Sequence, residues 1–94
     1  MKIKVKKMFA DVQLPEYATD GSGCFDIRAY LLSDDPVTVN NGDNVVFNTC
    51  LQFEIPEGFV MLVFSRSGHG FRNSVRLSNC VGVIDSDYRG ELKI

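Results

Sequence analysis

The chain of 94 residues has no tryptophan, a single histidine and no long apolar run. A helix needs about 20 consecutive apolar residues to cross a bilayer, and no segment approaches that length, so we expect no membrane span. The Lys-rich N-terminus has no apolar stretch behind it and does not have the form of a secretory signal. The net charge of −2 argues against a general DNA- or RNA-binding protein, which needs clustered Lys and Arg.

Cysteine is scarce as well, with only Cys24, Cys50 and Cys80. The number is odd, no pair has Cys-x-x-Cys spacing, and the one histidine is not at metal spacing from a cysteine. We therefore expect neither a disulfide framework nor a zinc site. The pattern predicts three reduced thiols, mostly buried, in a cytoplasmic protein.

Helical periodicity is also missing, and apolar residues instead recur at the period of two that indicates strands. The predicted strands cover residues 3–9, 24–29, 37–39, 45–55, 59–64, 75–84 and 91–94. The run at 59–64 is continuously apolar, which predicts a strand buried on both faces. Many short strands separated by turn signals predict one all-β domain over residues 1–94, either a sandwich or a barrel.

Two glycine-containing loops are candidates for binding. In the first, Asp26 follows Gly21 and Gly23, and its carboxylate is a candidate to contact the waters of a Mg²⁺ ion; the alternative is a glycine turn with a surface carboxylate. In the second, Arg66, Ser67 and Gly68 combine a guanidinium, a hydroxyl and an exposed backbone N–H, a combination that suits a phosphate. A solvated turn is the alternative there.

A third loop, residues 82–90, places two carboxylates and an aromatic ring after an apolar strand. Asp85 directly follows that strand, so the scaffold can orient it to deprotonate a water. Tyr88 can lay its ring against a sugar or a base. A hairpin turn with two solvated carboxylates is the alternative, but the three loops together indicate nucleotide hydrolysis.

These stretches resemble the motifs of the trimeric-type dUTP diphosphatase (dUTPase) family. Residues 14–29 are similar to its first motif, Arg66-Ser67-Gly68 to its second, and residues 82–90 to its third, almost residue for residue. The small size and the Gly-Cys-Phe-Asp sequence resemble a bacteriophage or bacterial member. The resemblance implies an all-β, dUTPase-like β-barrel or jelly roll of the β-clip type, and a homotrimer with active sites between subunits.

The resemblance also implies a role for each candidate residue. Asp26 would contact Mg²⁺ through water, and Asp85 would be the general base for water attack on the α-phosphorus of dUTP, giving dUMP and pyrophosphate. The residues that the resemblance implies for substrate binding are Arg66, Ser67 and Gly68 at the phosphates, Asn79, Val83 and Ile84 at the uracil, and Tyr88 at the deoxyribose. Such an enzyme limits uracil in DNA and supplies dUMP for thymidylate synthesis.

Two departures from the family pattern bear on function. Ser65 stands where the family usually has proline, which loosens the turn without removing a functional group. The family's fourth motif, Arg-x-Ala-Gln, and its Gly-rich C-terminal arm are missing, so we expect a C-terminally truncated member whose sheet is incomplete and whose activity is poor. The alternatives are a non-catalytic regulatory or protein-binding member and a dCTP deaminase-like enzyme, which shares the fold.

Overall fold

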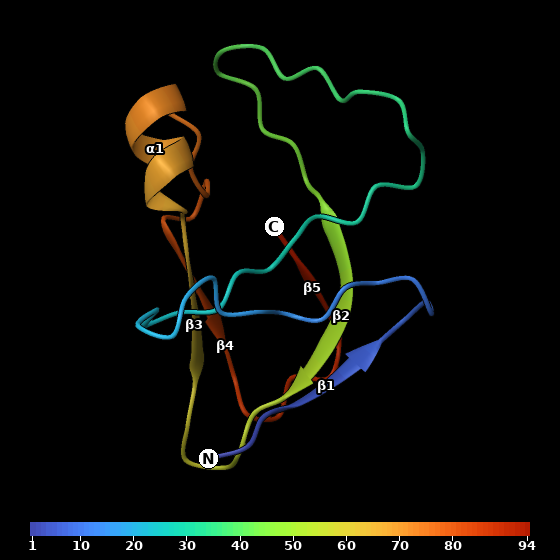
Figure 1. Ribbon diagram of the computed structural model, residues 1–94, viewed down its shortest axis with the longest axis vertical. Helices are drawn as coiled ribbons and strands as arrows, with labels where there is room; N and C mark the ends of the chain where they lie inside the picture. The colour runs from blue at the N-terminus through green and yellow to red at the C-terminus, as the bar shows by residue number, and fades with distance from the viewer. The chain divides into compact units, whose positions relative to one another are not determined.

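Five strands and one short helix are joined by long loops in the computed structural model, which describes residues 1–94 (Figure 1). The elements are β1 (Lys4–Lys7), β2 (Asn48–Glu54), β3 (Met61–Phe64), α1 (Ser67–Asn73), β4 (Val81–Ile84) and β5 (Glu91–Lys93). One sheet has the strand order β1-β2-β5, and β3 pairs with β4 in a second sheet. This mostly β architecture confirms the predicted fold class, and the sheets are open rather than closed into a barrel.

The chain divides into two compact units. Unit 1 contains Met1–Lys4 and Glu54–Tyr88, and unit 2 contains Val5–Phe53 and Arg89–Ile94. Each unit is described by itself below, and a single domain over residues 1–94 stays a prediction. The only helix has seven residues, so no helix is long and apolar enough to span a membrane.

In unit 2, β2 contains a β-bulge where it pairs with β5. Asn48 lies opposite Lys93 and Gln52 lies opposite Glu91, so β2 carries extra residues between the two pairs. Cys50 lies in this bulge with a φ of 54°, a left-handed conformation that side chains normally avoid. The bulge bends β2 and leaves backbone groups that the ladder itself does not pair.

Side chains supply the partners that the bulge removes. The buried hydroxyl of Thr49 donates to the carbonyl of Leu92 at 2.6 Å and accepts the N–H of Leu51 at 3.2 Å. The N–H of Cys50 donates to the Glu91 carboxylate at 2.9 Å. Because a buried backbone group without a partner is costly, these bonds make the irregular pairing stable and hold β5 against β2.

In unit 1, β3 and β4 form a regular antiparallel ribbon with one apolar face exposed. Leu62 pairs with Val83 and Phe64 with Val81, and paired residues share a face. All four side chains are exposed, Val83 by 58% and Phe64 by 57%. The prediction that residues 59–64 are buried on both faces is therefore wrong, because β3 has only β4 as a neighbour and only the Met61 face is covered.

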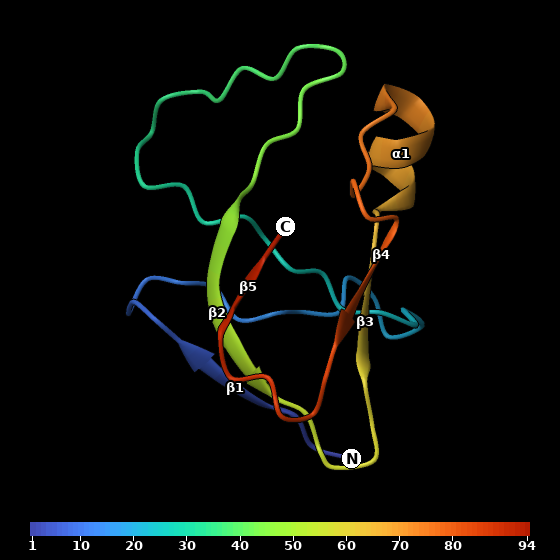
Figure 2. The ribbon, with the colours of Figure 1, turned by 180° about the vertical axis from the view of Figure 1, so that it is seen from behind.

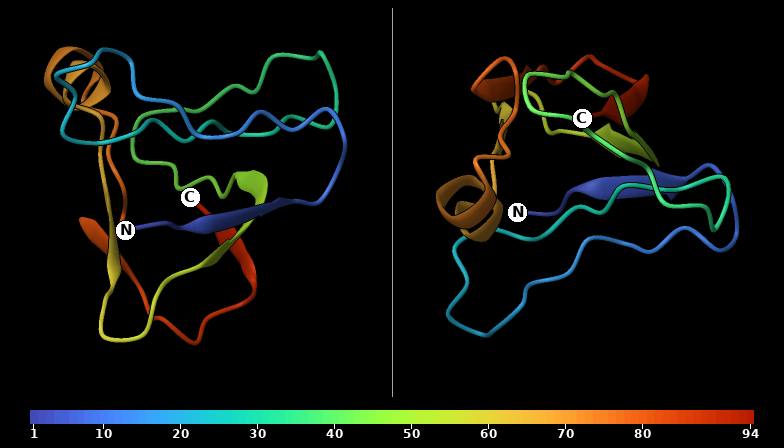
Figure 3. Two further views of the ribbon diagram at one scale, coloured as in Figure 1. Left: turned by 60° about the horizontal axis from the view of Figure 1, so that its bottom comes forward. Right: turned by 90° about the horizontal axis from the view of Figure 1, so that it is seen from above.

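Several other predicted strands are also shorter than expected or missing. Residues 24–29 contribute only an isolated bridge between Glu16 and Asp26, residues 37–39 lie in a long excursion without strands (Figure 3), and residues 75–84 are a strand only from Val81. Alternating apolar residues form a strand only where a partner strand supplies hydrogen bonds. Cys24 and Cys80 are exposed, so the prediction of mostly buried thiols is also wrong, although all three cysteines are free.

Helix α1 was not predicted, and it ends at a strained residue. Ser74 is its C-cap in the left-handed conformation, with φ 55° and ψ 27°, and its N–H bonds the carbonyl of His69. Glycine is the usual residue at this position because it has no Cβ to clash with the following carbonyl.

We therefore expect Ser74→Gly to stabilise the protein by about 1 kcal/mol. Asn73→Gly, one residue earlier and at the last position of the helix, is the matched control and should destabilise slightly, by roughly 0.3 kcal/mol, because asparagine is itself a weak helix former. Urea unfolding followed by circular dichroism measures both changes. A lower midpoint for Ser74→Gly would contradict the strain at this cap.

Candidate functional site

The predicted phosphate-binding residues lie at the start of α1 in unit 1. Arg66 is the N-cap residue with an extended backbone, and its carbonyl accepts the N–H of Gly70 at 2.9 Å. Ser67 and Gly68 are the first two helical residues, and all three are exposed. A Cβ added to Gly68 would meet nothing within 4 Å, so the backbone here is open to an approaching ligand.

Asn79 lies on the limb that returns from α1 to β4. The N–H of Cys80 donates to the carbonyl of Leu77 at 3.1 Å, and the N–H of Val81 donates to the carbonyl of Asn79 at 2.7 Å. These two bonds form a tight turn around Asn79, and Cys80 takes a φ of 66° within it. Asn79 is exposed, so its side-chain amide is available at the surface next to β4.

Asp85 and Tyr88 are brought together by a turn that directly follows β4. The N–H of Tyr88 donates to the carbonyl of Asp85 at 3.2 Å, the bond that closes a four-residue β-turn. Both side chains are exposed, Tyr88 by 43%. Before them, Val83 points to the exposed face of β4 and Ile84 is half-buried at its end.

The ribbon register separates these residues into two groups. Phe64 pairs with Val81 at the end that leads to Arg66 and Asn79, whereas Met61 pairs with Ile84 at the end that leads to Asp85. Figures 1 and 2 show α1 beyond one end of the β3–β4 ribbon and the chain after β4 leaving from the other. The four paired residues span about 10 Å, so Arg66 and Asp85 of one chain do not converge.

Asp26, the predicted metal residue, belongs to unit 2. Its N–H donates to the carbonyl of Glu16 at 2.9 Å, and its side chain is half-buried. No group of three or more His, Cys, Asp or Glu side chains is placed to hold a metal ion. A single carboxylate suits Mg²⁺ held through its waters and through substrate phosphates, because Mg²⁺ dehydrates reluctantly.

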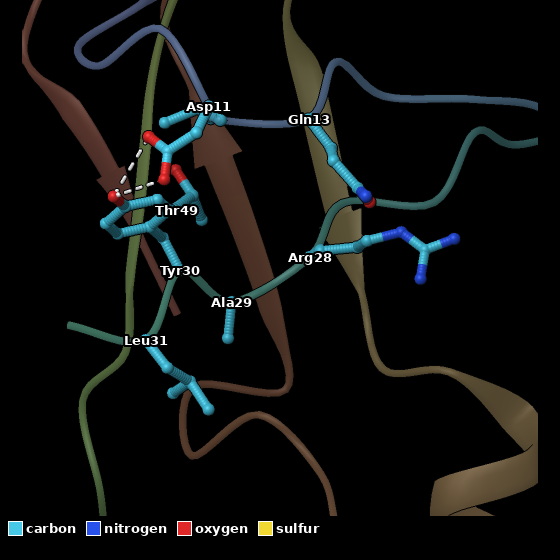
Figure 4. A pocket seen from close by; sticks show the side chains of 8 residues that line it. Asp11, Gln13, Arg28, Ala29, Tyr30, Leu31 and Thr49 are labelled. Carbon is cyan, nitrogen blue, oxygen red and sulfur yellow. Dashed lines mark hydrogen bonds between the residues drawn. The ribbon is translucent and has the colours of Figure 1, made fainter. Parts of the chain in front are cut away.

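A cavity of about 190 Å³ lies in unit 2. It is lined by Asp11, Val12, Gln13, Arg28, Ala29, Tyr30, Leu31 and Thr49. The hydroxyl of Tyr30 donates to both carboxylate oxygens of Asp11 at 3.1 Å, and Gln13 and Arg28 point away from that pair (Figure 4). None of the residues predicted to bind or hydrolyse a nucleotide lines this cavity.

The sequence model of the dUTPase family matches residues 10–94. The chain therefore belongs to the dUTPase family. The residues that resemble the family's second motif lie at the start of α1, and those that resemble its third motif form β4 and the turn after it.

Similar proteins cover this chain almost completely. Deoxyuridine 5'-triphosphate nucleotidohydrolases of Burkholderia mallei and Agrobacterium fabrum are 43% and 38% identical over 100% and 90% of the chain. The dUTPase of Staphylococcus bacteriophage 80alpha superposes with a TM-score of 0.81 over 98% of the chain at 27% identity. A mutant dUTPase of phage phi11 of S. aureus, described with a structural Mg(II) ion, superposes at 0.82 over 99%, with 26% identity.

The chain spans only part of the length of these relatives. It covers 64% of the Burkholderia protein, 54% of the Agrobacterium protein, and 56% and 57% of the two phage proteins.

The Tyr30–Asp11 pair at the cavity yields a pH-dependent prediction. The hydrogen bond to Asp11 is the main cause that raises the pKa of Tyr30 above its ordinary value of 10.0, with desolvation adding to it. Since the folded state favours the neutral phenol, its stabilising contribution is complete below pH 10.0 and is lost as pH rises through the folded pKa. The tyrosinate absorbance at alkaline pH should therefore show Tyr30 ionising above pH 10.0, and Asp11→Asn should move that step to lower pH. An unchanged step in this variant would contradict the role of Asp11.

Proposed function

We propose that the protein containing these residues hydrolyses dUTP to dUMP and pyrophosphate in the cytoplasm. The observation that carries this proposal is the turn directly after β4, whose backbone hydrogen bond places Asp85 and Tyr88 at the two ends of one turn in a dUTPase-family chain. The exposed Arg66–Gly68 segment supplies a guanidinium and backbone N–H groups for phosphates.

Recognition of the nucleotide falls to two segments of unit 1. Arg66, Ser67 and Gly68 bind phosphate oxygens, because a guanidinium fork and backbone N–H groups match them in charge and geometry. Asn79 and the backbone of Val83 and Ile84 bind the edge of the uracil. A cytosine there would leave buried polar groups without partners, and this penalty selects against the wrong base.

Asp85 acts as the general base. Its carboxylate accepts a proton from a water, whose oxygen forms a bond to the α-phosphorus while the bond from that phosphorus to the α,β-bridging oxygen breaks. Pyrophosphate leaves with that electron pair. Positioning and charge neutralisation account for most of the acceleration in such reactions. The Tyr88 ring packs on the deoxyribose, where a 2′-hydroxyl would clash.

Asp26 is the residue that would hold Mg²⁺, through the waters of the ion. When bound, the ion neutralises phosphate charge. The bond from the backbone N–H of Asp26 to the carbonyl of Glu16 holds the backbone that carries this half-buried carboxylate.

Assembly as a homotrimer would complete the site. A general base has to lie within hydrogen-bond reach of the water that it deprotonates, and that water has to lie beside the phosphates that Arg66 binds. Arg66 and Asp85 of one chain, however, lie beyond opposite ends of the β3–β4 ladder. A second copy can supply the missing partner. The exposed apolar face of Leu62, Phe64, Val81 and Val83 also favours contact between copies, because such faces mark interaction sites.

A regulatory role is the second candidate. The work on the bacteriophage 80alpha neighbour states that phage dUTPases control transfer of virulence genes. A chain with this fold and an exposed apolar ribbon face could keep a protein-binding function with or without turnover. Persistence of nucleotide binding without any hydrolysis by the complete gene product would favour this role.

The proposed activity is tested by incubating the gene product that carries these residues with dUTP and Mg²⁺. We expect dUMP and pyrophosphate, and we expect Asp85→Asn to lower kcat by roughly 10²-fold or more, because the amide cannot accept the proton. Asp87→Asn changes an exposed carboxylate in the same turn and should leave kcat near the parent value.

Binding separates loss of the base from loss of the site. The Kd of Asp85→Asn for the non-hydrolysable analogue α,β-imido-dUTP should stay close to that of the parent. Near-normal hydrolysis by this variant would remove Asp85 from the mechanism. Deamination of dCTP by the parent protein, without formation of pyrophosphate, would favour the deaminase alternative.

Tyr88 is expected to select the sugar. Tyr88→Ala should reduce the preference for dUTP over UTP by about tenfold or more, because the ring that excludes the 2′-hydroxyl is lost, while Mg²⁺ dependence stays the same. Tyr88→Phe retains the ring and should keep the preference. If the alanine variant rejects UTP as well as the parent does, the sugar is selected elsewhere.

A further inference from the structure

Ser65 makes a contact that ties together the two limbs of the chain around α1. It follows β3 directly and precedes Arg66, and its hydroxyl oxygen accepts the N–H of Leu77 at 2.9 Å. Leu77 lies on the limb that returns to β4. Both residues are half-buried, in contrast to the exposed residues between them that the proposed function uses.

The bond lies immediately beyond the last pair of the β3–β4 ladder. Phe64 pairs with Val81, and after that pair the two chains separate to form α1 and its return limb. The Ser65 hydroxyl thus extends the connection by one side-chain hydrogen bond past the end of the backbone ladder. A proline at this position has no side-chain acceptor and could not make this contact.

We infer that Ser65 is a positioning residue for the phosphate-binding segment Arg66–Gly68. Arg66 is the N-cap residue and its own backbone is extended, so the chain runs directly from Ser65 at the end of β3 through Arg66 into the first turn of α1. The bond from Leu77 to Ser65 holds the chain at the point where it leaves β3 and therefore sets the backbone from which the Arg66 side chain extends. This inference rests on the proposed nucleotide binding.

The turn around Asn79 keeps its own hydrogen bonds when this bond is lost, because Ser65 contacts the N–H of Leu77 whereas the turn uses the carbonyl of Leu77. Asn79 is held by a turn of its own, through the Cys80 N–H to the Leu77 carbonyl at 3.1 Å and the Val81 N–H to the Asn79 carbonyl at 2.7 Å. Loss of the Ser65 hydroxyl should therefore affect the binding of phosphates and leave the binding of the base unchanged. A purely structural role would weaken both together.

The test compares two probes in Mg²⁺ buffer by calorimetry, α,β-imido-dUTP and deoxyuridine. Ser65→Ala should raise the Kd of the triphosphate analogue about fivefold, the factor that one ordinary hydrogen bond contributes net, and should leave the Kd of deoxyuridine unchanged. Ser65→Thr retains the hydroxyl and should restore the parent value. Ser33→Ala removes an equivalent bond, from the Asp35 N–H to a serine hydroxyl at 3.1 Å, and should change neither Kd.

Each remaining outcome decides against a specific claim. Equal weakening of both probes, or no weakening of either, would overturn the positioning role of Ser65. If the parent protein binds neither probe, the proposed dUTP function fails instead. If Ser65→Ala does not fold, Ser65→Thr still tests the inference, because a parent-like Kd for both probes is required of it.

Discussion

The pairing of Phe64 with Val81 is the constraint on which the candidate site depends. This pair makes residues 65–80 one connection between the two strands, so that the last residue of β3 and the first residue of β4 are neighbours although they are far apart in sequence. The same register sets the opposite end, where Ile84 pairs with Met61 and the chain turns at Asp85. A shift of one residue would reverse the face of every side chain along β4.

An isolated two-stranded ribbon is only marginally stable in water, and this one leaves Leu62, Phe64, Val81 and Val83 uncovered on one face. In the proposed homotrimer, stability and the proposed activity then depend on the same contact between copies. Burial of that face supplies the apolar contact that the ribbon lacks, and in the proposed homotrimer a second copy also brings the two groups of site residues to one nucleotide.

The all-β class, the strand at the N-terminus, the strand at Glu91–Lys93 and the turn at Asp85 could all be predicted from alternation and turn residues. The separation of Arg66 from Asp85 could not, because it depends on which residue pairs with which across the β3–β4 ladder. The continuous apolar run at 59–64 shows that these residues are hydrophobic but not what covers each face of the strand. Phe64 is exposed because nothing in the chain covers its face of β3. The role of Ser65 depends on Leu77, a contact that local sequence does not reveal.

The bulge in β2 has a consequence for the way in which the sheet of unit 2 opens. Cys50 is 3% exposed, and burial, followed by the nearby Glu91 carboxylate, raises the pKa of its thiol. Thiols react with alkylating reagents as accessible thiolates, so Cys50 is protected for as long as the structure around β2 stays closed. Cys24 and Cys80 are exposed and react without any opening. The rate at which Cys50 is alkylated therefore reports local opening of unit 2, and Cys24 and Cys80 serve as reference thiols in the same molecule.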